Sequence, residues 1–589
     1  MLHKEFLSGN YRNTITSFFE EESNNISRAN LPSLVGSLSF TGRIFEAEKL
    51  FFQNNSDVDL EERSACLFFL GLGHSRKSKY SKARLIFKEN QKTLNINSTS
   101  LQKFYVYQGI AFYLFFIGKF ELALKWTNKS FENAVASKNI YARSLATDLL
   151  GHVKLRLGEI NLGIDSLKQA AELSRRLGNK SISESVEIAE LQYRAQYGYS
   201  RDAIFKELLS KFANIKTEDS YSRAVVGLEL ARQLTLRGQY AHSEEVLDNI
   251  SISIFSSENR RQEILLNLRF AENYYQLGRD SQAWNYLRSA RRCLDFEADK
   301  SFEMQILGFE AKLFKDEKKA EIISQLLART KSFNSVLNQN ILKRQSLLAV
   351  ETFNHEDLFH DFLVSLESEL DPVKKIINSS YWSLLFKYIE VPRGKDCLYL
   401  DLERNLVIIF SEKKIDIPEG GLTPLDLKLL LNIVNGSCSK EELCKMVWGY
   451  EYDSYRHDMM IYTALSSLRK NLASASSWIE TTEKGYAFST ERMLKIRDSL
   501  TPVADKSEIS DERKFLLNLS SDLNLRQIKA LSHLRKHEAI DVSEYKIIFK
   551  VSDITASRDL RALKEKGLVI SIGKARAIKY ILGGSHYEN

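Results

Sequence analysis

A chain of 589 residues is too long for one hydrophobic core, so we expect three or more domains. Its composition, 43% hydrophobic and 27% charged, excludes a disordered chain, and the small numbers of Pro (6) and Gly (26) favour long helices over a loop-rich β fold. The formal net charge of +7 permits nucleic acid as a partner without requiring it.

The N-terminal residues and the apolar runs bear on the location of the protein. The first residues, MLHKEFLSGNYRN, lack the apolar stretch of a secretory signal. The longest apolar run, GIAFYLFFIG at 109–118, is too short to span a bilayer. The five cysteines are scattered and form no CxxC pair, which is typical of reduced, structural thiols. We therefore expect a cytoplasmic protein without membrane contact, metal or cofactor.

Residues 1–335 contain an internal repeat. A glycine is followed five residues later by a small residue, and from position 78 onward such pairs recur every 40 residues. The glycine gives the backbone freedom for a tight turn between antiparallel helices, and the small residue lets the second helix approach the first. The pairs are Gly42/Ala47, Ser78/Ala83, Gly118/Ala123, Gly158/Gly163, Gly198/Ala203, Gly238/Ser243 and Gly278/Ala283.

This repeat resembles the tetratricopeptide (TPR) pattern, with slightly longer helices. The resemblance implies an α-solenoid whose concave face binds a protein or peptide. Aromatic residues such as Phe104 and Tyr274 either line that face or form the core between repeats. No HExxH, GxSxG or GxxxxGK[ST] motif is present, so we do not expect an enzyme. Residues 336–392 are predicted to be a helical connector that includes a helix over 357–370.

Near residue 396 the spacing between apolar residues changes from about four residues to two, which predicts a small antiparallel sheet over 396–416. Thr423 and Pro424 then mark the beginning of a helix. Ser439 and Glu442 have capping-box spacing and predict a second helix, which ends at 447–449. A third helix over 455–472 and a hairpin over 478–489 complete the predicted order.

The segments LTPLDLKLLLNIV, SKEELCKMVWGYEYD, ALSSLRKNL and IETTEKGYAF resemble the OmpR/PhoB-type winged helix, over residues 393–492. The resemblance implies that the third helix enters the DNA major groove and that the hairpin touches the backbone or minor groove. However, 13 Lys and Arg face 15 Asp and Glu over this range, which leaves a protein-binding domain open. The candidate DNA-binding residues are Arg456, His457, Tyr462, Thr463, Ser466, Ser467, Arg469 and Lys470, with Lys484 in the hairpin.

Residues 493–512 are polar and are predicted to form a linker. The segment 513–584 then predicts helices over 524–536, 543–549 and 553–566, followed by two strands around 573–576. Ser552 is placed to cap the third helix. Its inward face is predicted to contain Ile554, Leu560 and Leu563.

The stretch VSDITASRDLRALKEKGLV resembles the DeoR-type helix-turn-helix. The resemblance implies that Thr555, Ser557, Arg558 and Arg561 face the groove, and that Lys574 and Arg576 reach phosphate or the minor groove. The alternative for Arg558 is a local ion pair with Asp559. Over 511–589, 15 Lys and Arg face 10 Asp and Glu, which favours DNA.

The sequence thus predicts a mainly α protein: a TPR-like α-solenoid followed by two small α/β winged-helix domains. We expect a transcription regulator that binds double-stranded DNA and receives a protein or peptide signal on the solenoid. The alternative is an interaction scaffold whose winged helices bind proteins. A homodimer is left open.

Overall fold

The computed structural model is mainly α, as predicted, and divides into two compact units, Met1–Ile389 and Glu390–Asn589. None of the described helices is both long and apolar enough to cross a membrane. The structure describes residues 2–20, 30–54, 58–216, 219–257, 259–295, 298–314, 321, 357–366, 368–402, 404–434, 436–497, 523, 525–537, 539–566, 568–573 and 578–582.

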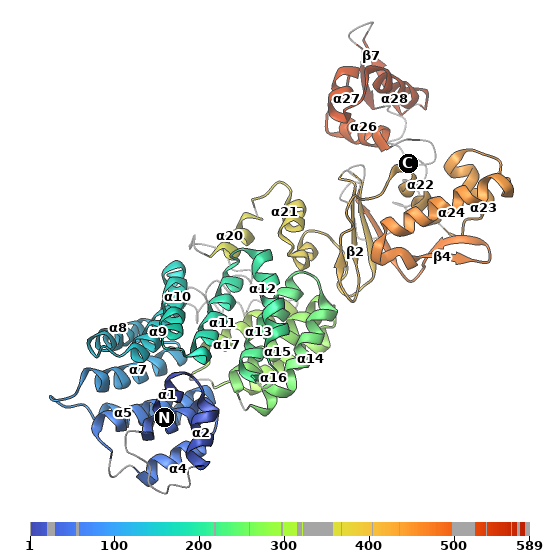
Figure 1. The fold of residues 1–589 in the computed structure, drawn as a ribbon. Coiled ribbons are helices and arrows are strands. Elements are labelled where there is room, and N and C mark those ends of the chain that lie inside the picture. Colours follow the sequence, from blue (N-terminus) through green and yellow to red (C-terminus); the bar gives the residue numbers. More distant parts are fainter. Residues whose placement is uncertain are drawn as a thin grey trace. The chain divides into compact units, whose positions relative to one another are not determined.

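The first unit is a succession of antiparallel helices, each packed against the next (Figure 1). This is the solenoid-like arrangement that the repeat predicts. The helices are α1 (Leu2–Leu7), α2 (Tyr11–Glu20), α3 (Leu31–Phe40), α4 (Ile44–Asn54), α5 (Leu60–Arg76), α6 (Tyr80–Gln91), α7 (Ser100–Phe116), α8 (Phe120–Ala136), α9 (Ile140–Leu157), α10 (Ile160–Arg176), α11 (Lys180–Tyr197), α12 (Arg201–Asn214), α13 (Ser220–Leu236), α14 (Tyr240–Ser256), α15 (Arg260–Gln276), α16 (Asp280–Arg292) and α17 (Lys300–Leu313).

The repeat pairs lie at the turns between helices, as predicted. Each of the six glycines has a positive φ, between 66° and 92°, and Ser78 adopts φ 57° in the same role. The small residue of most pairs is buried where the second helix meets the first. Ala203 is the exception: it is exposed, and Ile204 takes the buried position, because α12 begins after an additional left-handed residue, Ser200.

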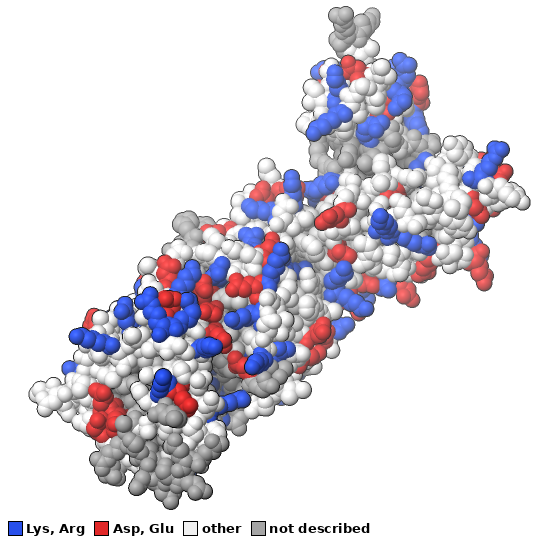
Figure 2. Space-filling model, viewed as in Figure 1, with Lys and Arg blue, Asp and Glu red and all other residues white. Residues whose placement is uncertain are grey.

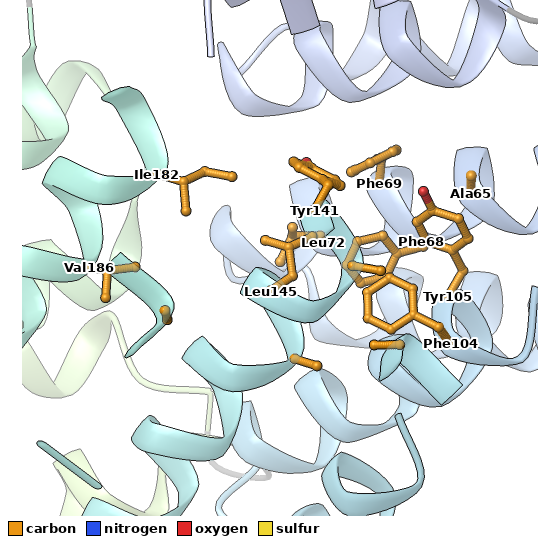
Figure 3. Close-up of a cluster of buried hydrophobic side chains, with 14 of the residues drawn as sticks. Ala65, Phe68, Phe69, Leu72, Phe104, Tyr105, Tyr141, Leu145, Ile182 and Val186 are labelled. Atoms are coloured by element: carbon orange, nitrogen blue, oxygen red, sulfur yellow. The ribbon is translucent and has the colours of Figure 1, made fainter. Parts of the chain in front are cut away.

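Aromatic and aliphatic side chains from successive helices form one continuous core through the first half of this unit. Figure 3 shows Phe68 of α5 beside Phe104 and Tyr105 of α7, and the ring centroids of Phe68 and Tyr105 are 5.7 Å apart. Phe104 is fully buried, so it belongs to the core between repeats and not to an open concave face. Tyr274 is likewise buried.

The N-terminal helices of the unit also make contacts far along the chain. The ring of Phe6 lies 5.5 Å from that of Tyr141, and the Asn179 side-chain amide donates a hydrogen bond to the Leu7 carbonyl over 2.8 Å. These contacts join α1 to α9 and to the residue that caps α11.

A second long-range contact joins the last repeats to the α7–α8 hairpin. The Arg261 guanidinium on α15 lies over the rings of Tyr80, Phe116 and Phe302, at 5.9, 5.3 and 5.2 Å from their centroids. Beside it, α8 and α17 share a small apolar cluster. The solenoid therefore closes on itself instead of remaining an open array. The cluster consists of Phe120, Met304, Leu307 and Ala311.

The described part of the connector belongs to the first unit, where it forms α20 (Leu358–Ser365), α21 (Pro372–Ser379) and η3 (Trp382–Lys387) and packs against α11 and α13. Arg201 lies over the rings of Phe362 and Tyr381, at 4.4 and 5.3 Å. The predicted helix over 357–370 ends earlier, at Ser365, and Asp371 caps the next helix, in which Pro372 is the first residue.

The second unit begins with β1, β2 and β3, which form a four-stranded sheet in the order β3-β2-β1-β6, and continues with helical elements and a separate hairpin of β4 and β5 before β6. The predicted caps are present, since Thr423 with Asp426 and Ser439 with Glu442 both form capping boxes. The elements are β1 (Cys397–Asp401), β2 (Leu406–Phe410), β3 (Ile415–Asp416), α22 (Pro424–Ile433), α23 (Lys440–Leu443), η4 (Cys444–Trp448), α24 (Ser454–Asn471), η5 (Ala473–Trp478), β4 (Ile479–Thr482), β5 (Gly485–Phe488) and β6 (Met493–Arg497).

The assignment of 493–512 to a linker is wrong for its first residues. Met493–Arg497 form β6, which pairs in parallel with β1 and buries Leu494. The polar residues of this strand alternate with apolar ones, as expected for a strand with one exposed face. Its partner strand lies about a hundred residues earlier in the chain, so no local pattern predicts the pairing.

The last module consists of α26 (Leu525–Lys536), α27 (Val542–Phe549), α28 (Asp553–Glu565), β7 (Val569–Ile572) and β8 (Lys579–Leu582), close to the predicted boundaries. Ser552 caps α28, as predicted. The prediction that Ile554 faces inward is wrong, because its side chain is 82% exposed. Ala556, Leu560 and Leu563 form the buried face at helical spacing, and residue 554 lies on the opposite side.

Candidate nucleic-acid interface

The helix α24 has one buried and one exposed face. Its buried residues are Ile461, Ala464, Leu465 and Leu468. On the other side, candidate residues recur at helical spacing over about four turns. The N-terminus of the helix is fixed by Asp453, whose carboxylate accepts hydrogen bonds from the backbone amides of Tyr455 and Arg456 in the first turn. The exposed candidates are Arg456, Tyr462, Thr463, Ser466, Ser467 and Lys470.

A polar network attaches α23 to α24 and orients one candidate. The Lys440 ammonium donates to both Asp458 carboxylate oxygens over 3.0 Å and to the Tyr462 hydroxyl over 2.8 Å. The Tyr452 hydroxyl donates to the same carboxylate over 2.6 Å. Hydrogen bonds from Tyr452 and Lys440 lower the pKa of Asp458, so the network stays ionised near neutral pH. Sequence reasoning missed Lys440 and Asp458, since the two residues lie on different helices.

Two of the predicted DNA-contact residues donate hydrogen bonds within the protein. The Arg469 guanidinium is half-buried and donates to the Ile479 carbonyl over 2.9 Å and to the Thr481 hydroxyl over 3.1 Å. The Thr463 hydroxyl donates to the Met459 carbonyl one turn earlier. Arg469 therefore positions the hairpin against α24, which differs from the groove contact implied by the resemblance.

A shallow hollow lies at the C-terminal end of α24. Ser466, Lys470, Ser476 and Ser477 contribute hydroxyls and one ammonium to its wall, together with Arg469. Hydroxyls and a cation are the groups that commonly hold a phosphate oxygen of a nucleic-acid backbone. The adjoining hairpin exposes Lys484 at its tip.

Acidic residues surround the same face. Glu451 and Asp453 are exposed at the beginning of α24, and Glu480 and Glu483 are exposed on the hairpin. These carboxylates would repel a phosphate backbone placed next to Lys470 and Lys484.

Arg469→Ala is expected to loosen the β4–β5 hairpin by about 1–2 kcal/mol, because it removes charge-assisted hydrogen bonds to β4. Hydrogen exchange of the 479–488 amides should become roughly tenfold faster. Lys470→Ala changes an exposed neighbour and serves as the control. Equal exchange rates in the two variants would show that Arg469 does not position the hairpin.

On α28, Arg558 and Arg561 are exposed, and they lie three residues apart on the face opposite Leu560 and Leu563. A three-residue turn, in which Lys550 adopts φ 50°, separates α28 from α27. A turn of this length is the kind that joins the two helices of a helix-turn-helix. Thr555 and Ser557 are half-buried, and the Thr555 hydroxyl lies 3.0 Å from that of Ser552 within the cap. Lys574 and Arg576 lie outside the described residues.

Asp559 is directed into the core of the last module. Its carboxylate accepts hydrogen bonds from Arg526 over 2.9 Å and from the buried Tyr545 hydroxyl over 3.3 Å. Burial, and then the adjacent Asp559 carboxylate, raises the pKa of Tyr545. Arg558 is exposed, whereas the adjacent Asp559 is buried and bonded to Arg526 and Tyr545, which differs from the alternative of a local ion pair between Arg558 and Asp559.

Figure 2 shows Lys and Arg side chains gathered over the visible face of the last module, with few acidic side chains among them.

No protein-family model matches this chain, and no curated protein shows detectable similarity to it. Within the described ranges, no three His, Cys, Asp or Glu side chains lie close enough together to hold a metal ion.

Proposed function

We propose that this protein is a DNA-binding transcription regulator. Its two winged helices, the OmpR/PhoB-like 393–492 and the DeoR-like 513–584, contact double-stranded DNA, and the TPR-like unit receives a protein or peptide signal. The observation that carries the proposal is the face of α28, where Arg558 and Arg561 project from the second helix of a helix-turn-helix within a positively charged module.

The first winged helix contributes a weaker contact in this proposal. The exposed hydroxyls of α24 and the hollow beside Lys470 suit the phosphate backbone, whereas the acidic residues around them limit the affinity. Two modest modules in one chain bind more tightly than either alone, because binding by the first raises the effective concentration of the second.

The test is DNA binding by the full-length chain at several salt concentrations, with Arg558→Ala/Arg561→Ala beside it. We expect the logarithm of the association constant to fall by roughly 0.9 per phosphate contacted for each tenfold rise in salt. The double variant should bind at least about tenfold more weakly, because each lost base or phosphate contact costs about 1–3 kcal/mol.

Lys413→Ala/Lys414→Ala removes the same charge from the turn between β2 and β3 and should leave the affinity nearly unchanged. An equal loss in this control would indicate non-specific charge attraction. Binding too weak to measure at low salt would refute the regulator.

In that event the second candidate, a scaffold whose winged helices bind proteins, would be favoured. The observation that supports it is the exposed set of acidic side chains around α24 and its hairpin, which suits a basic protein surface better than a phosphate backbone.

A further inference from the structure

The helix α28 begins with an exposed isoleucine. Ile554 is the second residue of this helix, and its side chain is 82% exposed, whereas Leu560 and Leu563 further along are fully buried. A single exposed apolar side chain is common on protein surfaces, so exposure alone assigns it no role. What distinguishes Ile554 is the side of the helix on which it lies.

Ile554 shares one exposed side of α28 with two arginines. Arg558 follows it by four residues and Arg561 by seven, and residues at these spacings lie above one another along a helix. The buried residues of the helix occupy the opposite side. The side that we propose to face DNA therefore carries an aliphatic group at its N-terminal end and two guanidinium groups beyond it.

The polar groups next to Ile554 have partners within the protein. The Asp553 carboxylate pairs with the Lys546 ammonium of α27 at 3.0 Å, which offsets a charge that would repel phosphate. The Ser552 hydroxyl accepts a hydrogen bond from the Thr555 backbone amide as the helix cap. The first turn of α28 thus presents Ile554 among polar groups that are already bonded.

The chemistry of the major groove offers one kind of partner to an isoleucine at this position. In a helix-turn-helix the N-terminal residues of the second helix contact base edges. Isoleucine neither donates nor accepts a hydrogen bond through its side chain, so it cannot read the polar atoms of a base edge. Among the four bases, thymine presents a methyl group there, and covering this methyl group removes apolar surface of both partners from water.

We propose that Ile554 is a specificity-determining residue of the α28 interface, and that its side chain covers the C5 methyl group of one thymine in the major groove. The inference rests on the proposed DNA binding and deepens it by naming a base that α28 selects. Arg558 and Arg561 suit the acceptor oxygens of guanine or of phosphate, so Ile554 adds a contact of a different kind.

The experiment first selects the tightest binding sites of the full-length protein from a pool of random double-stranded DNA. Each thymine of the selected site is then replaced singly by uracil, which keeps the base pair and removes only the methyl group. We expect the association constant to fall about fourfold at one thymine at least, which is the loss that corresponds to one buried methyl group.

The variant Ile554→Ala tests whether this side chain makes the methyl contact. It should bind the thymine site about fourfold more weakly, and replacement of that thymine by uracil should then cost nothing further, because the two changes remove the same contact. The matched control is Ile547→Ala, since Ile547 is 74% exposed in the same module but lies on α27, before the turn. This control should keep the fourfold loss on uracil replacement. Thermal unfolding checks that both variants are folded.

The outcomes distinguish this inference from the proposed function. Uracil replacement without effect at every thymine would refute the methyl contact, and so would a loss that persists in folded Ile554→Ala or disappears in Ile547→Ala as well. Binding without any sequence preference would likewise refute the reading of thymine and leave DNA binding in place. Failure to bind the DNA pool even at low salt would refute both.

Discussion

Gly485→Ala is expected to unfold the β4–β5 hairpin. Gly485 has φ +132°, and a Cβ atom at this position would lie 2.1 Å from the Cys438 carbonyl oxygen. The backbone there cannot move away, because Cys438 and Tyr486 exchange two backbone hydrogen bonds of 2.8 and 2.9 Å. The strained φ and the clash together should lower the free energy of unfolding by about 3 kcal/mol or more.

Hydrogen exchange of the 436–489 amides in the full-length protein measures this loss, and about 3 kcal/mol corresponds to roughly hundredfold faster exchange. The matched control is Gly420→Ala in the same unit. Gly420 has φ +91° with no atom near its Cβ position. Alanine there meets no clash, so only the cost of a left-handed backbone conformation remains, about 1 kcal/mol. Similar rates in the two variants would mean that the hairpin tolerates the clash.

Asp559→Ala is expected to destabilise the last module by about 3 kcal/mol. The substitution leaves the buried Tyr545 hydroxyl and the half-exposed Arg526 guanidinium without their carboxylate acceptor. If α28 binds DNA, the affinity should fall as well, because α28 loses its ion pair with Arg526 of α26. Circular dichroism and hydrogen exchange over 540–566 report the loss of structure.

Arg558→Ala, at the neighbouring position, separates the loss of stability from the loss of DNA binding. Its side chain is exposed, so stability should change by less than about 0.5 kcal/mol while DNA binding weakens. Asp559→Asn keeps the shape and the acceptor oxygen and should recover part of the stability. If Asp559→Ala is as stable as Arg558→Ala, the buried network does not hold the module together.

Features that depend on a few neighbouring residues could be predicted from the sequence. The glycine turns of the repeat, and the caps formed by Thr423, Ser439 and Ser552, follow from backbone freedom and from side-chain acceptors near a helix start. These signals lie within five residues of the structure that they determine, and the order of helices follows from them.

Features that join distant parts of the chain could not be predicted. The pairing of β6 with β1 and the aromatic surroundings of Arg261 both need the three-dimensional fold. The same limit applies to the candidate site. The two sequence motifs predict both Arg469 and Arg558 on helices that contact DNA. Only the packing of the folded chain shows that Arg469 holds a hairpin and that Arg558 faces solvent.

The closure of the solenoid has a consequence for folding. In an open repeat array each repeat contacts only its neighbours, so the terminal repeats fray first and unfolding spreads along the chain. Here α1 is joined to α9, and α15 and α17 are joined to α7 and α8, so terminal helices of the unit share their stability with its middle. The unit should therefore melt in one cooperative transition. It should also fold slowly for a helical protein, since these contacts close loops of more than a hundred residues.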